Sequence, residues 1–169
     1  MQDLQGRRPL AADEFRDLIG HFATGVTVIT TEHDGRRFGT TASAVTSLSL
    51  EPPMLVVCMH QQSETGRAIG RSRRFAVNIL AEAHAGIAVR FAGKGPDRFD
   101  DVAVTAGAYG QPLLDDALAT FECRVDRTTI GGTHTVFLAH AVTGAARPGA
   151  PLAYFRGQFG RLLADLPGT

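Results

Sequence analysis

The sequence lacks the features that nucleic-acid-binding proteins usually need. It has no tryptophan and only two tyrosines, so few large rings are available for base stacking. Its 17 basic residues equal its 17 acidic residues, and the formal net charge is zero. A protein that binds nucleic acid usually carries a basic surplus that neutralises phosphates. The composition therefore argues against a nucleic-acid partner.

Long apolar runs and paired cysteines are also missing. The longest apolar run, residues 54–59, is far shorter than the roughly 20 residues that span a bilayer. Arg7 and Arg8 are not followed by the apolar core of a signal peptide. Cys58 and Cys123 each lie in an apolar segment and belong to no zinc-type spacing. We therefore expect a soluble cytoplasmic protein with reduced thiols, no membrane contact and no metal.

The length of 169 residues fits one domain. Residues 1–10 show no periodic pattern, and we expect a loose N-terminal arm there, followed by a single domain over residues 11–169. A helix is predicted to begin near Ala12, with Asp13 as a suitable N-cap and Gly25 as a suitable end. Its apolar face is formed by residues at helical spacing: Phe15, Leu18, Ile19 and Phe22.

Most of the remaining chain has the pattern of β-strands. Strands are predicted at residues 26–31, 37–44, 54–59, 75–80, 120–125, 133–142 and 151–159. Asp34-Gly35 is a strong hairpin signal. In the strand 120–125, alternation predicts that Cys123 faces inward and Glu122 outward. Short helices are predicted at 63–70 and 83–92, so we expect a mainly β (α+β) closed barrel with a few inserted helices.

One stretch, residues 39–59, combines small hydroxylated residues, a proline turn and a buried strand. Small residues let a flat ligand approach the backbone, and hydroxyl groups can bond its polar edge. From composition alone, a polar edge strand is an equally good interpretation. The hydroxyl-bearing residues of this stretch are Thr40, Thr41, Ser43, Thr46, Ser47 and Ser49.

The segment that follows favours a ligand site. Ser63 and Thr65 stand where the free N–H groups of a helix begin, and such groups attract anions. Arg67 lies one turn further on and offers a guanidinium group. A hydroxylated cradle followed by a phosphate site suits a flavin mononucleotide. The rest of the basic cluster is typical of a solvated face: Arg71, Arg73 and Arg74.

Seven segments, in order over about residues 11–162, resemble the short-chain flavin reductase family. These proteins are the reductase components of two-component flavin-dependent monooxygenases. The segments are HFATGVTVIT (21–30), GTTASAVTSLSLEPP (39–53), VCMHQQSET (57–65), FAVNIL (75–80), FECRV (121–125), GGTHTVF (131–137) and PLAYFRGQFGRL (151–162). The resemblance implies an FMN-binding split β-barrel, a homodimer, and hydride transfer from NADH or NADPH to FMN or FAD. The reduced flavin then leaves for a partner monooxygenase.

The resemblance also implies roles for individual residues. Flavin contacts are expected from Thr41, Ala42 and Ser43 at the ring edge, Thr46 and Ser47 near the ribityl chain or phosphate, Cys58 and Met59 beside the ring, Ser63 and Thr65 at the phosphate, and Phe91 and Ala92 over the flavin. The segment holding Tyr154, Arg156 and Gly157 is expected to border the nicotinamide.

His134 matches the histidine that the family places beside the nicotinamide. The family has aspartate at the preceding position, and this chain has Thr133 there, which removes a carboxylate that would orient or charge the imidazole. His134 and His140 are six residues apart on one predicted strand, too far apart to chelate a metal without a third ligand.

Two other functions are compatible with the same residues. One is a split-barrel FMN-dependent oxidase that keeps its flavin tightly bound, and the other is a non-catalytic flavin-binding protein. A reductase must release its flavin, so flavin that is lost during purification favours the reductase. NADH consumption then distinguishes an enzyme from a carrier.

Overall fold

The computed structural model describes residues 8–95 and 97–163. Most of the predicted N-terminal arm, residues 1–7, therefore lies outside the described residues, and residues 8–10 belong to no helix or strand. The structure is mainly β with inserted helices, which confirms the predicted fold class. The helices are α1 (Ala12–Gly20), α2 (Glu64–Ser72) and α3 (Ala85–Ala92), with short 3₁₀ turns η1 (Glu82–His84) and η2 (Asp97–Phe99).

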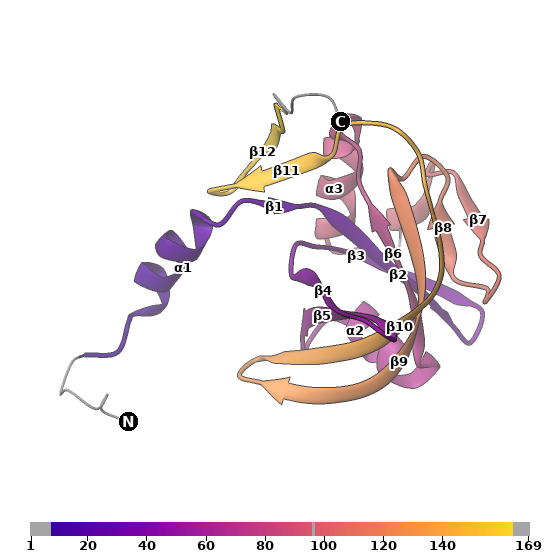
Figure 1. The fold of residues 1–169 in the computed structure, drawn as a ribbon, viewed down its shortest axis with the longest axis horizontal. Coiled ribbons are helices and arrows are strands. Elements are labelled where there is room, and N and C mark those ends of the chain that lie inside the picture. Colours follow the sequence, from indigo (N-terminus) through magenta and orange to yellow (C-terminus); the bar gives the residue numbers. More distant parts are fainter. Residues whose placement is uncertain (1–7, 96, 164–169) are drawn as a thin grey trace.

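The largest sheet is antiparallel and has the strand order β3-β2-β6-β9-β10-β5-β4 (Figure 1). Its strands are β2 (Thr27–His33), β3 (Arg36–Ala42), β4 (Val45–Leu50), β5 (Pro53–His60), β6 (Arg74–Ile79), β9 (Ala119–Gly131) and β10 (His134–Ala146). A second sheet joins β1 (Thr24–Gly25), β11 (Leu152–Phe155) and β12 (Gln158–Arg161). A third pairs β7 (Val104–Ala106) with β8 (Pro112–Leu114).

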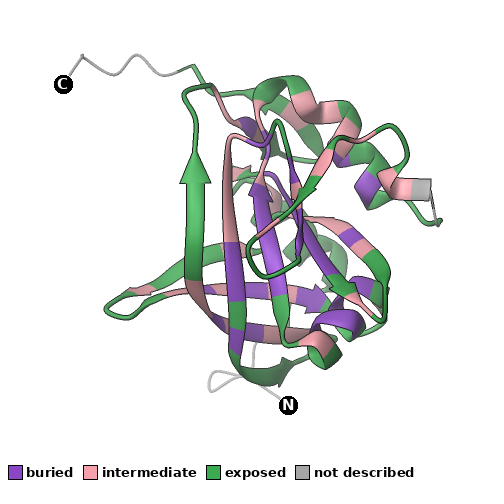
Figure 2. Ribbon diagram, turned by 90° about the vertical axis from the view of Figure 1, so that its right-hand side faces the viewer, coloured by how far each residue is buried: buried purple, intermediate pink, exposed green. Residues whose placement is uncertain are grey.

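The large sheet separates two apolar cores. The first core lies within the curve of the sheet, includes Phe75, Val125 and Phe137, and is reached from α2 by Ile69. The second core joins Val28 of β2 to Phe91 of α3. Figure 2 shows the buried positions concentrated on the central strands. The two cores arise because alternate residues of one strand face opposite sides of the sheet.

The β2–β3 hairpin forms where the sequence predicts it. Asp34 and Gly35 have φ angles of 51° and 72°, which are the left-handed conformations that a type I′ turn requires. The strand pairing starts directly beside this turn, with His33 opposite Arg36. Because this turn matches the twist of the strands, it sets the register that carries Ala42 to the opposite end of the hairpin.

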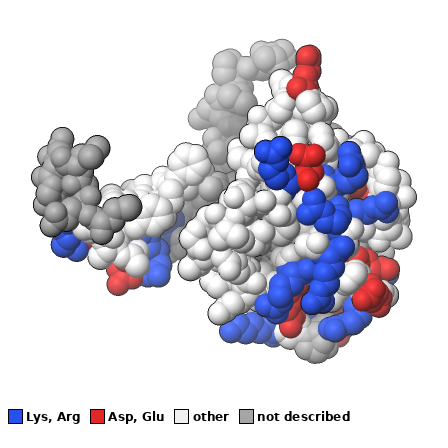
Figure 3. Space-filling view, turned by 90° about the horizontal axis from the view of Figure 1, so that it is seen from below, with Lys and Arg blue, Asp and Glu red and all other residues white. Residues whose placement is uncertain are grey.

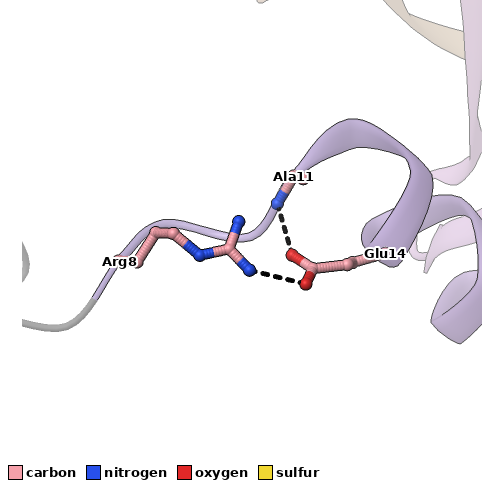
Figure 4. Close-up of polar contacts among 3 residues, drawn as sticks. All are labelled: Arg8, Ala11 and Glu14. Atoms are coloured by element: carbon pink, nitrogen blue, oxygen red, sulfur yellow. Dashed lines mark hydrogen bonds and ion pairs between the residues drawn. The ribbon is translucent and has the colours of Figure 1, made fainter.

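Helix α1 begins and ends differently from the prediction. Its N-cap is Ala11, whose N–H donates to the Glu14 carboxylate at 2.8 Å, while Arg8 donates to the same carboxylate at 2.6 Å (Figure 4). These two bonds lower the pKa of Glu14 below its ordinary value. The predicted Asp13 cap is therefore wrong, because Asp13 lies inside the first turn and Glu14 does the capping. The helix also ends at Gly20, before Gly25.

The apolar face of α1 has no partner within the described chain. The helix stands away from the main body in Figure 1 and contains no buried residue. The relative exposures on this face exceed one half: Phe15 57%, Leu18 58%, Ile19 52% and Phe22 72%. The amphipathic pattern is thus as predicted, but the face does not pack onto this protein's own cores.

Glu122 corrects a second expectation. It was predicted to point to solvent from β9, but only 4% of the residue is exposed. Its two carboxylate oxygens accept the N–H groups of Ala108 and Tyr109 at 2.8 and 2.9 Å. The loop between β7 and β8 covers this side of the sheet, so both faces of β9 are buried here.

Candidate functional site

A cleft of about 900 Å³ surrounds the edge strand β4 and the β3–β4 connection. Its wall is apolar and includes Leu55, Ile79 and Phe121. Hydroxyl groups and one thiol belong to the same cleft: Ser43, Thr46, Ser47, Ser49 and Cys58. A cavity of this size is within the range of about 300–1,000 Å³ that small-molecule sites occupy. The structure thus brings together four of the predicted flavin contacts: Ser43, Thr46, Ser47 and Cys58.

Strand pairing holds these contacts in place. The N–H of Cys58 donates to the Ala44 carbonyl at 3.0 Å, and Val45 lies opposite Val57 in the β4–β5 register. The connection at residues 43–44 is therefore fixed against the end of β5. Small residues at this connection leave room for a ligand to approach the backbone.

A second cleft of about 550 Å³ adjoins the first. It lies between α1 and the β11–β12 turn and is lined by Tyr154, Arg156 and Gly157. The turn is anchored to α1, because the Arg156 N–H donates to the Gly20 carbonyl at 3.0 Å and the Arg156 guanidinium lies 3.4 Å from the Asp17 carboxylate. The predicted nicotinamide segment therefore faces its own chamber.

The two clefts share one wall. Ser43 and Thr24 line both, together with Ile19 and Phe22 of the α1 segment. The hydroxyl oxygen of Thr24 is buried and has no hydrogen-bond partner among the described residues. An unpaired buried hydroxyl is costly, and this oxygen has a hydrogen-bonding capacity beside the junction that no described residue uses. Two clefts that meet at Ser43 and Thr24 can hold two flat ligands with polar edges, so that the two ligands touch each other at the junction.

His134 lies at the same end of the sheet. It is the first residue of β10 and pairs with His60, while Val136 pairs with Cys58. Side chains that are directly opposite, or two residues apart along a strand, share one face of a sheet. His134 therefore lies on the same face of the sheet as Cys58, about 7 Å further along the strands. The Thr133 hydroxyl lies 3.0 Å from Nδ1 of His134.

The residues predicted to bind the flavin phosphate, at the start of α2, lie outside the two clefts described above. The Ser63 hydroxyl accepts the Gly66 N–H at 3.2 Å, which confirms the predicted cap. Thr65 is 1% exposed, and its hydroxyl has no partner among the described residues. Arg67 donates to the Gln62 carbonyl at 3.0 Å and lines a small pocket of about 210 Å³. These residues lie close together, but none of them lines either larger cleft.

Basic side chains continue beyond α2. Figure 3 shows Lys and Arg gathered on one part of this face of the main body, beside a broad area without charge. Arg74 lies opposite Arg124 in the β6–β9 register, and Arg73 donates to the carbonyls of Val125 and Asp126. An exposed surface that carries like charges on adjacent strands is compatible with the predicted solvated face.

Several predicted contacts have packing roles in the structure. The Thr41 hydroxyl donates to the Ala88 carbonyl of α3 at 2.6 Å, and its neighbours Thr40 and Ala42 are half-buried on β3. Met59 lies in the first core with 4% exposure, so the predicted contact rests on its backbone. Ala92 is the exposed last residue of α3.

The burial of Phe91 contradicts its predicted position over the flavin. It is fully buried in the second core, and its ring lies 5.1 Å from that of Phe99 in an edge-to-face arrangement. A Cβ at Gly39 would lie 2.5 Å from the Phe91 ring, so Gly39 is small because the ring fills this space. The ring has no exposed surface with which to cover a ligand.

The sequence did not identify several contributors to the site. Ile19 and Phe22 were predicted only as part of the apolar face of a helix, and Thr24 was given no role, but all three line both clefts. His60 was not singled out, because only the β5–β10 register brings it to His134.

Among residues 8–95 and 97–163 no cluster of His, Cys, Asp and Glu could hold a metal ion. No helix within those ranges has the length and apolar character needed to cross a membrane.

Comparison with known proteins identifies the domain type. Residues 19–163 match the flavin reductase like domain. The chain is 48% identical over 156 residues to the reductase component of a 4-nitrophenol 4-monooxygenase/4-nitrocatechol 2-monooxygenase from Rhodococcus opacus, covering 92% of this chain and 84% of the relative. It is 39% identical over 154 residues to a flavin reductase (NADH) from Kitasatospora aureofaciens, covering 88% and 81% of the two chains.

A solved structure agrees with these relatives. The fold matches that of an NADH:FAD oxidoreductase from Streptomyces globisporus C-1027 in complex with NAD and FAD fragments, with a TM-score of 0.88 and 31% identity. The match covers 95% of this chain and 100% of that one. The structural neighbours are flavin reductases of the split-barrel fold, so the predicted architecture is confirmed in its specific form.

Proposed function

Because the chain belongs to the flavin reductase like domain family, we propose that it is an NADH-dependent flavin reductase that supplies reduced flavin to a monooxygenase component. The observation that carries the proposal is the pair of clefts that meet at Ser43 and Thr24. Hydride transfer between two ring systems requires that they lie in contact, and adjoining clefts supply that arrangement.

An enzyme that consumes NADH needs the cytoplasmic pool of this nucleotide. We therefore expect this protein to be in the cytoplasm.

The larger cleft suits the flavin. Its apolar wall accepts a ring system, while the hydroxyl groups of Ser43, Thr46 and Ser47 can bond the polar edge and the ribityl chain. The smaller cleft suits the nicotinamide, with Tyr154 and Arg156 at its border. Relatives are described as NADH-dependent and as acting on flavin, FMN or FAD, which supports NADH and leaves both flavins as substrates to test.

The residues of this chain bind and orient in the proposed reaction. Bound flavin supplies the ring that accepts a hydride from NADH. Apolar residues such as Ile79 and Phe121 exclude water from the larger cleft, which strengthens the polar contacts at its rim. Arg156 places a cation at the border of the smaller cleft, where a nucleotide phosphate gains from it. His134 lines neither cleft, and its assignment as the candidate catalytic residue beside the nicotinamide is supported by the family resemblance alone.

NADH oxidation at 340 nm tests the proposal directly. The purified protein is given NADH and an excess of free FMN or, separately, FAD. We expect many turnovers per enzyme, with reduced flavin appearing in solution. An absence of NADH oxidation, together with flavin that remains bound through gel filtration, would overturn the reductase and favour a tight-flavin oxidase or a flavin carrier.

A substitution at the junction localises the reaction. Ser43→Phe places a ring where both clefts meet, so the KM values for NADH and for flavin are expected to rise together, by about tenfold or more. The matched control is Thr105→Phe on β7, an exposed strand position outside both clefts. Equal kinetics of the two variants would remove the site from this junction.

A homodimer is the assembly that this site favours. The exposed apolar residues of α1 form a surface that a monomer would leave in water, and contiguous surfaces of this kind mark protein contacts. Ile19 and Phe22 belong both to this surface and to the clefts. A second copy that covers α1 would therefore also close the ligand chambers against solvent. We assign the face to a second copy of this chain.

A further inference from the structure

His60 and His134 form an imidazole pair at the end of the β5–β10 ladder. They lie directly opposite each other in the antiparallel register. Their ring centroids are 5.3 Å apart and the ring planes meet at 80°, which is an edge-to-face contact. Aromatic rings prefer this geometry over a parallel sandwich. Both residues are exposed, so neither ring is held by burial in a core.

Backbone contacts fix the two turns that carry the rings. The Gln61 N–H donates to the Thr133 carbonyl at 3.0 Å, and the Gln61 side-chain amide donates to the Gly132 carbonyl at 3.1 Å. The segment after β5 is thus bonded to the turn before β10. The backbone positions of His60 and His134 are therefore fixed relative to each other, which places the two exposed rings within contact distance.

Hydrogen bonding also fixes the tautomer of His60. The N–H of Gln62 donates to Nδ1 of His60 at 3.1 Å. A nitrogen that accepts a hydrogen bond carries no proton, so the neutral ring of His60 has its proton on Nε2. A proton on Nδ1 would break the bond to Gln62. The Nδ1 side of the His60 ring is therefore bonded to the segment that follows β5.

His134 is held from two sides. The Thr133 hydroxyl occupies Nδ1 at 3.0 Å, and His60 contacts the ring itself. Nε2 of His134 is then the nitrogen left to meet a ligand. Small errors in the orientation of such a group are expensive, because productive contacts depend on positions held within about 0.5 Å. A ring that fixes this orientation affects binding without touching the ligand.

We propose that His60 is a positioning residue for His134. Its ring holds the His134 imidazole in the orientation that meets the nicotinamide, and its Nδ1 bond to Gln62 holds His60 in turn. The proposal rests on the proposed function for the role of His134, but the pairing of the two rings is independent of it. Thr133 and His60 together then hold His134 without a neighbouring carboxylate.

Two substitutions separate positioning from a purely structural role. His60→Phe keeps an aromatic ring against His134 and loses the acceptor for the Gln62 N–H. His60→Asn keeps an acceptor near the place of Nδ1 and loses the ring. If the ring positions His134, His60→Asn raises the KM for NADH about two- to tenfold, while the KM for flavin stays close to wild type. His60→Phe retains most of the NADH affinity. The reverse order, with His60→Phe more damaging, would overturn the proposal.

A double-mutant cycle tests whether His60 acts through His134. In a His134→Ala background the ring of His60 has nothing to position, so adding His60→Asn is expected to leave the KM for NADH where His134→Ala alone puts it. Additive losses would show that His60 acts on its own and would overturn the proposal.

Imidazole nitrogen NMR makes the outcome independent of turnover. The spectrum of wild type is expected to show His60 as the Nε2–H tautomer, and the His134 ring signals are expected to move in His60→Asn far more than in His60→Phe. If these shifts appear in a protein that does not oxidise NADH, the pairing stands and the proposed function fails. Unmoved His134 signals in an active enzyme would overturn the pairing alone.

Discussion

Glu122 illustrates how a single buried carboxylate holds a loop. Its oxygens accept the N–H groups of Ala108 and Tyr109, and Gly107 packs so closely that an added Cβ would lie 2.4 Å from the carboxylate. A buried charge is tolerated when hydrogen bonds replace its water. The loop between β7 and β8 is therefore attached to β9 through one side chain.

Replacement of Glu122 by alanine should destabilise the protein. The change removes the acceptor for two backbone N–H groups and leaves a cavity, so we expect the free energy of unfolding to fall by about 1–3 kcal/mol. Urea denaturation measures it. Glu51→Ala is the matched control, because Glu51 is an exposed turn residue and its loss should cost less than about 0.5 kcal/mol. Equal losses in the two variants would contradict the role given to Glu122.

Cys123 makes stability depend on alkaline pH. Burial, aided by the charge of Glu122, raises the pKa of the Cys123 thiol from 9.0 to about 12. Below pH 9 the thiol is protonated in both the folded and unfolded states. Above it, the unfolded chain loses a proton that the folded chain keeps, so stability falls as pH rises from about 9 to 12. Urea denaturation between pH 8 and pH 10.5 should show a steeper decline for wild type than for Cys123→Ala, and parallel curves would contradict this.

The same shift predicts which thiol reacts. Cys123 is buried and protonated, whereas Cys58 is half-buried beside the larger cleft. An aromatic disulfide reagent at pH 8 should therefore modify one thiol in the folded protein and two after unfolding. Cys58→Ser should leave no reactive thiol in the folded state, and a residual reaction there would show that Cys123 is accessible.

At the scale of elements, α2 offers a test of the predicted phosphate site. Ser63→Ala removes the cap of α2 and should cost about 1 kcal/mol of stability. Ser63→Asp restores a cap, but it also places a negative charge where a phosphate would bind. If the N-terminus of α2 holds the flavin phosphate, Ser63→Asp is stable and binds flavin about tenfold more weakly. Flavin titration monitored by fluorescence measures this, and wild-type affinity of Ser63→Asp would rule the phosphate site out.

The elements that the sequence predicts well are those with a local cause. The β2–β3 hairpin follows from two residues that tolerate positive φ, and the α2 cap follows from one hydroxyl. The predicted exposure of Glu122 was wrong, because alternation identifies the two faces of a strand but does not show what covers each face. The predicted strand over residues 151–159 is a hairpin, β11 and β12, turning at Arg156 and Gly157 with φ of 46° and 80°.

The contacts in the site that depend on pairing between distant strands could not be predicted from the sequence alone. His134 was predicted from a resemblance, but His60 lies 74 residues earlier in the chain and meets it only through the β5–β10 register. A shift of one residue would turn one of the two rings to the opposite face. Ser43 and Arg156 likewise approach the same junction from opposite ends of the chain.

At the scale of the whole molecule, α1 is the element whose surroundings are incomplete. It stands clear of the body in Figure 1, and its apolar face is exposed over a full helical stripe. A helix this short has little stability of its own, because most helical stability in proteins comes from packing an apolar face. The proposed second copy supplies that packing, and it links assembly to the ligand clefts through Ile19 and Phe22.

A charge on the apolar face of α1 should therefore separate the two copies and weaken flavin binding together. Leu18→Glu is expected to convert a dimer into a monomer in light scattering after gel filtration, and to raise the KM for flavin about tenfold as the clefts open to solvent. The matched control is Arg37→Gln, which changes the net charge by the same amount at an exposed position of β3 that lines neither cleft. It should remain dimeric with wild-type kinetics. A wild-type protein that elutes as a monomer, or a Leu18→Glu protein that stays dimeric, would assign the α1 face to another role, while a monomeric Leu18→Glu with unchanged flavin kinetics would separate assembly from the site.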